Sequence, residues 1–141
     1  MKTTLLSVLL VAGQALAGGF FLQLGNPEAS PEARKLNAVL TIQALGCHNP
    51  MEAKLSAVAI GMVNGERREI SLKLDPLSKP GFYALSQQWP KEGKWVIKVT
   101  ARNGELFTNS LVTAGPDGVD RFHDRADRRE FTAAEVDAML K

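Results

Sequence analysis

The chain has 141 residues, of which 45% are hydrophobic and 23% are charged, and its formal net charge at pH 7 is +2. This near balance of charge offers no electrostatic basis for binding nucleic acid or an acidic membrane surface, so neither is expected as a partner. A single cysteine cannot form an internal disulfide, so the hydrophobic core must stabilise the fold unaided.

The first 17 residues have the pattern of a secretory signal peptide. Lys2 precedes an apolar run from Leu5 to Ala12, and Ala15-Leu16-Ala17 supplies small residues for the cleavage site. The run is shorter than the about 20 apolar residues that span a bilayer, so we expect cleavage after Ala17 and no retained transmembrane segment. The expected location is therefore periplasmic or secreted, with 141 − 17 = 124 residues left and a net charge of +1 once Lys2 is removed.

Two strands are predicted before the cysteine. The short apolar run from Phe20 to Leu24 ends at Gly25-Asn26-Pro27, and the polar stretch from Glu28 to Arg34 reads as a loop or a helical turn. Between Leu36 and Ala44, apolar and polar residues alternate, which is typical of a half-buried strand. The second strand leads directly into the cysteine-containing turn.

A hairpin is predicted after this turn. Leu55 to Met62 is apolar on both faces, as in a central strand, and Asn64-Gly65 is the dipeptide best suited to a type I′ turn. Ile70 to Leu74 alternates again as the returning strand, and we expect Asp75-Pro76 to end it.

Three further strands complete the predicted sheet region, at Phe82 to Ser86, Lys94 to Ala101 and Glu105 to Thr113. Trp95 is in phase with the apolar positions of its strand and is expected in the core. Trp89 precedes Pro90 and is expected to pack over the turn in preference to forming an exposed recognition surface. Gly115 to Gly118 is expected to close the sheet. The pattern of residues 18–118 therefore predicts an all-β fold of about seven strands, an immunoglobulin-like antiparallel β-sandwich.

Residues 119–141 are predicted to form a charged tail with a short C-terminal helix. Thr132 and Glu135 have the spacing of a capping box, and Phe131 and Val136 that of a hydrophobic staple. A helix this short persists only when it is docked. It is expected to dock either on its own sandwich or on a partner protein.

The turn Leu45 to Met51 holds the one candidate metal site. Cys47, His48 and Met51 carry thiol, imidazole and thioether groups within five residues, a set that suits copper(I). Neighbouring strand residues point to opposite faces, so Cys47 and His48 converge only where the strand has ended. Asn49-Pro50 makes this possible, because the residue before a proline is expected to be extended and the chain turns there. Met62 and His123 are further potential ligands.

The number of available ligands excludes two other kinds of site at this turn. Haem attachment needs two cysteines, and a structural zinc site usually needs four Cys or His ligands, so both are excluded. A nucleophile pair of adjacent Cys47 and His48 has unfavourable geometry and no third orienting group, so no catalytic residue is expected. Cys47 remains either a small buried residue, a metal ligand, or the site of an intermolecular disulfide.

One stretch of the sequence resembles the pattern of the YtkA-like and FixH-like exported domains. In that pattern, a glycine and a tyrosine are followed by a glycine, a tryptophan and alternating apolar residues. The pattern lies in Gly81-Phe82-Tyr83, Pro90 and Gly93 to Val99, and the resemblance covers roughly Ala53 to Thr113. It implies a small immunoglobulin-like domain outside the inner membrane, with Tyr83 and Trp95 packing the core. FixH-like proteins keep a membrane helix, whereas this chain is expected to lose its apolar segment.

The leading functional prediction is a non-enzymatic exported domain that binds an envelope or extracellular protein. The alternative is a periplasmic copper-handling protein that uses Cys47, His48 and Met51, in which case copper would be its one cofactor. A redox-sensitive protein that forms an intermolecular disulfide through Cys47 is a third reading.

Overall fold

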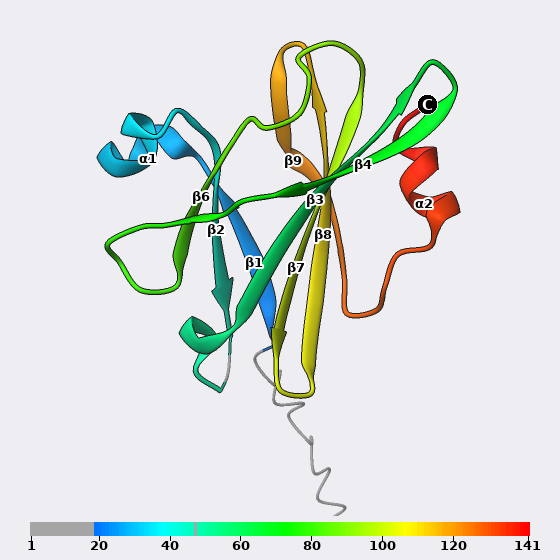
Figure 1. The fold of residues 1–141 in the computed structure, drawn as a ribbon. Helices are drawn as coiled ribbons and strands as arrows, with labels where there is room; N and C mark the ends of the chain where they lie inside the picture. Colours follow the sequence, from blue (N-terminus) through cyan, green and yellow to red (C-terminus); the bar gives the residue numbers. More distant parts are fainter. Residues whose placement is uncertain (1–18, 47) are drawn as a thin grey trace, which may run out of the picture.

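Two antiparallel sheets pack face to face in the computed structural model, which describes residues 19–46 and 48–141 (Figure 1). The first sheet has the spatial order β1 (Phe21–Gly25), β2 (Ala38–Leu45), β6 (Phe82–Ser86) and β5 (Asp75–Pro76). The second has the order β4 (Glu66–Leu72), β3 (Lys54–Val63), β7 (Trp95–Asn103), β8 (Leu106–Gly115) and β9 (Gly118–Asp127).

The strand order is that of an immunoglobulin-like sandwich. Strands β1, β2, β6 and β5 take the places of A, B, E and D, while β4, β3, β7 and β8 take those of C′, C, F and G. The chain crosses between the sheets after β2, after β4 and after β6, and β9 adds one strand beside β8. The predicted fold class is therefore confirmed.

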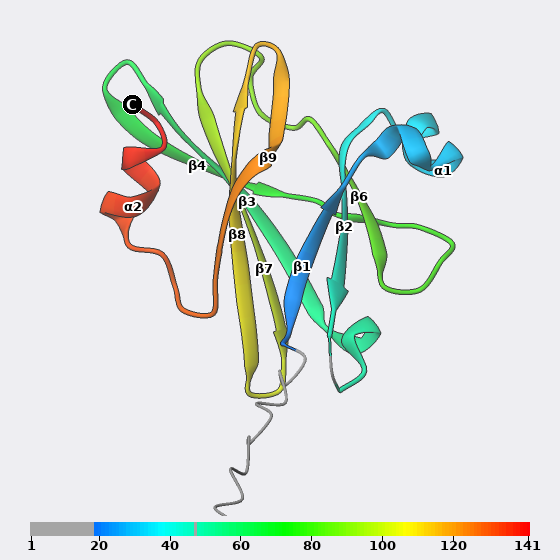
Figure 2. The ribbon, with the colours of Figure 1, turned by 180° about the vertical axis from the view of Figure 1, so that it is seen from behind.

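Four short helices complete the described part of the chain: η1 (Pro27–Ala29), α1 (Pro31–Lys35), η2 (Pro50–Glu52) and α2 (Ala133–Ala138). The first two correspond to the segment predicted as a loop or helical turn. Figures 1 and 2 show α1 and α2 on opposite sides of the sandwich, with α1 beside the first sheet and α2 beside the second. None of these helices has the length and apolar composition required to cross a membrane.

The core between the sheets is built from alternate residues of facing strands. It includes Leu40 and Ile42 of β2, Ile97 and Val99 of β7, and the indole of Trp95, which is 2% exposed. Each strand contributes every second side chain because successive residues point to opposite faces. The outer face of the second sheet has its own apolar cluster under the C-terminal segment.

Of the two aromatic residues that the family resemblance places in the core, Trp95 is buried there, and Tyr83 is partly buried and packs against the same cluster. Trp89 is also buried, as predicted. The Asn64-Gly65 turn has φ angles of 52° and 79°, the left-handed values that a type I′ turn requires. These local predictions are confirmed.

Nine strands are present in the described residues, two more than the sequence pattern predicted. Asp75-Pro76, expected only to end a strand, forms the two-residue β5 after the chain has crossed to the other sheet. The expectation that the sheet closes at Gly118 is wrong. Pro116-Asp117 is a tight turn, and the charged residues after it form β9 along the edge of the second sheet.

The short C-terminal helix forms as predicted and docks on its own sandwich. Thr132 and Glu135 make both hydrogen bonds of the capping box. Phe131 and Val136 are buried against the outward-facing side chains of the second sheet, in a cluster completed by Ile60, Val96 and Leu111. The helix ends at Ala138, three residues before the end of the chain.

Candidate functional site

The predicted ligand set falls on the connection between β2 and β3, at one end of the sandwich. Cys47 lies outside the described residues, so its surroundings stay a prediction. His48 is exposed, and Met51, within η2, is 61% exposed. Two of the three proposed ligand side chains are therefore accessible to solvent on one loop.

A residue at the end of β7 holds the backbone of this connection. The side-chain amide of Asn103 donates hydrogen bonds to the carbonyl oxygens of His48 at 2.7 Å and Asn49 at 3.1 Å. His48 and Asn49 have φ angles of 64° and 53°, so Asn49 is left-handed and not extended as its position before Pro50 predicts. Asparagine tolerates this conformation better than most residues, and the contacts of Asn103 stabilise it. The turn forms, but with a backbone that the sequence rule did not foresee.

The more distant potential ligands do not join this loop. Met62 lies near the end of β3, whereas the loop precedes the start of that strand. His123 belongs to β9, at the opposite end of the second sheet from Asn103. Across residues 19–46 and 48–141, no three His, Cys, Asp or Glu side chains lie close enough together to hold a metal ion.

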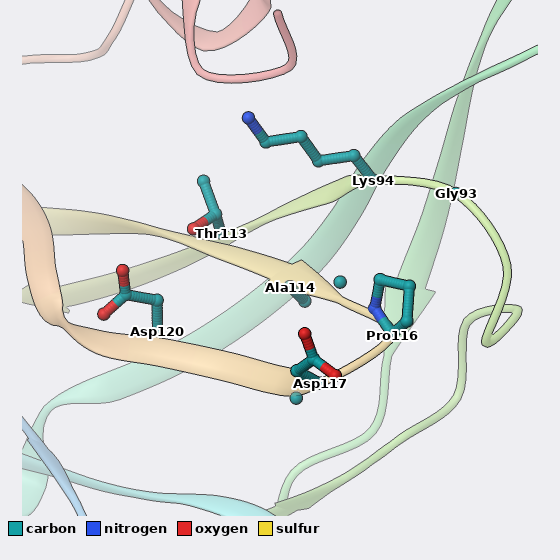
Figure 3. A pocket seen from close by; sticks show the side chains of 9 residues that line it. Gly93, Lys94, Thr113, Ala114, Pro116, Asp117 and Asp120 are labelled. Atoms are coloured by element: carbon teal, nitrogen blue, oxygen red, sulfur yellow. The ribbon is translucent and has the colours of Figure 1, made fainter.

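A hollow of ≈ 390 Å³ lies at the other end of the molecule, beside the turn between β8 and β9 (Figure 3). It is lined by Gly93, Lys94, Thr113, Ala114, Gly115, Pro116, Asp117, Gly118 and Asp120. Lys94 extends along one side, and the carboxylates of Asp117 and Asp120 lie on the other. The ammonium of Lys94 also donates to the main-chain oxygen of Lys141 at 2.9 Å.

A large bulge in β9 lies next to the hollow. Leu111 pairs with Arg125 and Thr113 pairs with Asp120, so residues 121–124 of β9 stand opposite Val112 alone. The extra residues leave the regular ladder, and a bulge of this kind bends the strand and re-aims its side chains. Phe122, His123 and Asp124 are all exposed on this bulged part of the edge strand.

Phe122 is the most exposed large apolar side chain in the described residues, at 77%. The guanidinium of Arg121 lies 4.6 Å from the centre of its ring. Asp120 accepts a hydrogen bond from the backbone N–H of Phe122 at 3.2 Å and lies 2.9 Å from Nδ1 of His123. Phe122, Arg121 and His123 are called the β9 protrusion below.

The charge state of Asp120 supports this arrangement. The side-chain hydrogen bond with His123, together with its charge, holds the pKa of Asp120 below its ordinary value. Asp120 is therefore an ionised acceptor that contacts both the backbone N–H of Phe122 and the ring of His123.

Comparison of the chain with known protein families, with curated proteins and with solved structures finds no match. The functional residues are therefore inferred from their own geometry.

The sequence pattern did not single out Phe122. The sequence shows only one aromatic residue among many acidic and basic residues, and this composition is equally typical of a solvated tail. Only the pairing of β9 with β8 shows that this residue stands on a sheet edge.

The C-terminal segment is fixed by ion pairs as well as by apolar contact. Arg129 makes two hydrogen bonds to the carboxylate of Glu135, at 2.6 and 2.9 Å, and Arg67 pairs with Asp137. The bond from Arg129, with that from Thr132, lowers the pKa of Glu135 to about 2, and the pKa of Arg129 is raised in turn. The pair of Arg67 with Asp137 links the helix to β4, and Arg125 of β9 lies 3.7 Å from Glu135, so the helix is attached to its own sheet.

Proposed function

We propose that this protein is a non-enzymatic exported domain that binds a partner protein of the envelope or extracellular space through the β9 protrusion. The signal-peptide pattern of residues 1–17 supports export. The immunoglobulin-like fold agrees with the resemblance to YtkA-like and FixH-like exported domains, and we propose membership of that group.

The exposure of Phe122 is the observation that carries this proposal. A phenylalanine that is 77% exposed leaves most of its apolar surface in water, an unfavourable arrangement that binding relieves. The flanking Arg121 and His123 supply charge and hydrogen-bond donors beside the ring. An aromatic anchor with an adjacent arginine is the composition typical of energetically dominant interface residues.

The position on an edge strand adds to this argument. Natural proteins usually blunt exposed sheet edges with charged side chains or bulges, and β9 carries both. Neither device requires a large aromatic side chain at the tip of the bulge. Phe122 is therefore explained better by recognition of a partner than by edge protection.

Site-specific photocrosslinking in the producing organism tests the proposal. A photoreactive phenylalanine analogue at position 122 is expected to give one discrete protein adduct, which Arg121→Glu should weaken. The same analogue at Met51, which is also well exposed but lies at the other end of the sandwich, is the matched control.

The captured partner then allows a quantitative measurement. Phe122→Ser should weaken its binding by about 25-fold or more, since hot-spot residues cost about 2 kcal/mol or more when truncated. The variant should unfold at the same temperature as the original protein, because Phe122 has little buried surface. Equal affinity of the two proteins, or an adduct from position 51 and none from position 122, would contradict the proposal.

Copper handling through Cys47, His48 and Met51 is the second candidate function. One observation favours it, namely that the side chains of His48 and Met51 are both exposed on the loop that carries Cys47. A thioether and an imidazole in solvent are accessible to a soft metal ion.

A further inference from the structure

A second hollow, of ≈ 250 Å³, lies on the outer face of the second sheet, beside the start of the C-terminal segment. It is lined by Ser56, Ala57 and Val58 of β3, by Lys98, Thr100 and Arg102 of β7, and by Glu130. We call it the basic hollow. It shares no lining residue with the hollow beside the β8–β9 turn.

Strand register explains why these side chains meet. Lys98, Thr100 and Arg102 are alternate residues of β7, so their side chains share the outer face. On β3, Ser56 pairs with Thr100 and Lys54 with Arg102. Two hydroxyl groups therefore lie between a lysine and an arginine on one face of the sheet.

Glu130 supplies the one carboxylate among the residues that line the hollow. Its two oxygens lie 3.5 Å from Nζ of Lys98 and 3.7 Å from Nη2 of Arg102. Both separations exceed the 2.7–3.2 Å of a direct N–H···O hydrogen bond, so these ion pairs are loose. The two cations thus converge on one acidic group that neither binds closely.

Two contacts keep the components in place. The guanidinium of Arg102 stacks on the ring of Phe107, 4.4 Å from its centre. The buried amide of Asn109 donates to the main-chain oxygen of Arg129 at 2.7 Å, which anchors the residue before Glu130. The side chain of Glu130 itself is 55% exposed, so it is not enclosed by the hollow.

We propose that the basic hollow binds a small oxyanion, a carboxylate or phosphate group, in the place that the Glu130 carboxylate occupies. Two cations and two hydroxyl donors against one carboxylate leave a net charge of +1 in the lining, which favours an additional or replacing anion. Glu130 then acts as an internal competitor that weakens binding. This site is independent of the β9 protrusion and of the proposed partner.

An NMR titration of the ¹⁵N-labelled protein with inorganic phosphate, and in parallel with succinate, at constant ionic strength tests the site. Amide shifts are expected around Ser56 and Thr100, and the stronger of the two probes shows whether phosphate or carboxylate is preferred. Glu130→Gln should bind about two- to fivefold tighter than the original protein, because removing one loose ion pair removes a competitor of that strength.

In the Glu130→Gln background, Lys98→Gln and Arg102→Gln should each weaken binding by about two- to fivefold. Lys73→Gln is the charge-matched control, since Lys73 pairs with Asp75 away from the hollow. The proposal is overturned if neither anion shifts these amides, if Glu130→Gln binds no tighter, or if Lys73→Gln weakens binding as much as Lys98→Gln.

Discussion

Gly61→Ala is expected to destabilise the fold more than its small size suggests. Gly61 pairs with Trp95 across β3 and β7, and the indole ring lies directly against it. A Cβ atom at position 61 would lie 2.5 Å from Cε3 and 2.6 Å from Cδ2 of that ring, where ordinary contact is 3.4–4 Å. The ring must therefore move by about 1 Å in a close-packed core.

The size of the effect follows from what restrains the ring. Trp95 is 2% exposed, and its indole N–H donates to the main-chain oxygen of Glu92 at 3.1 Å. Overpacking a core costs about 1–3 kcal/mol, and weakening this hydrogen bond adds to that cost. We expect a loss of about 2–3 kcal/mol in the free energy of unfolding, or roughly 6–15 °C in the melting temperature.

Urea unfolding followed by tryptophan fluorescence and by circular dichroism measures this loss. Gly115→Ala is the matched control, because nothing lies within 4 Å of a Cβ atom built there, and it should change stability by less than about 0.5 kcal/mol. In a Trp95→Phe background the cost of Gly61→Ala should fall, since the smaller ring leaves room. Equal stability of Gly61→Ala and Gly115→Ala would refute the proposed contact.

Two further predictions concern charge and metal. Because the folded-state pKa of Glu135 is about 2, below its unfolded value of 4.5, its carboxylate stabilises the fold above about pH 4.5, and this contribution is lost as the pH falls toward 2. Glu135→Gln should therefore be less stable at pH 7 and lose less stability between pH 4.5 and 2 in urea unfolding; a parallel pH profile would argue against the Arg129 contact. If the protein binds a partner protein and handles no metal, anaerobic titration should show only weak copper(I) binding, equal with and without Cys47→Ser. Tight binding that Cys47→Ser abolishes, and that substitution of His48 or Met51 weakens, would instead support the copper function.

Much of the sandwich is predictable from local pattern. Phe82–Ser86 is a strand with the predicted bounds, and the turn at Asn64-Gly65 and the capping box of Thr132 and Glu135 form as their residue types require. These features depend on backbone preferences and on contacts within a few residues. They need no knowledge of the rest of the chain.

The two strands that the sequence pattern missed, β5 and β9, depend instead on contacts with the rest of the chain. Asp75-Pro76 is too short to show any periodicity, and its pairing with β6 depends on where the chain crosses between the sheets. The residues of β9 lie on an edge, where solvent covers one side and charged side chains are favourable. Without a buried face, a strand leaves little alternation in the sequence.

The candidate sites also differ in whether their residues are neighbours in the sequence. The sequence identified Cys47, His48 and Met51 because their side chains carry metal-binding chemistry within one short stretch. The basic hollow combines residues from β3, β7 and the C-terminal segment, separated by up to 74 positions from Ser56 to Glu130. No local pattern relates residues so far apart, and each is an ordinary surface side chain when taken alone.

By itself, the sequence determined the all-β class, the hairpin turn at Asn64-Gly65 and the helix cap, since these follow from the spacing of apolar residues and from turn chemistry. Only the tertiary structure decided that the C-terminal helix covers its own sheet, because that choice depends on the outward side chains of Ile60, Val96 and Leu111 on three strands. It also decided that Phe122 projects from a bulge. A bulge is a difference in the number of residues between two paired strands, so it exists only once both strands are paired.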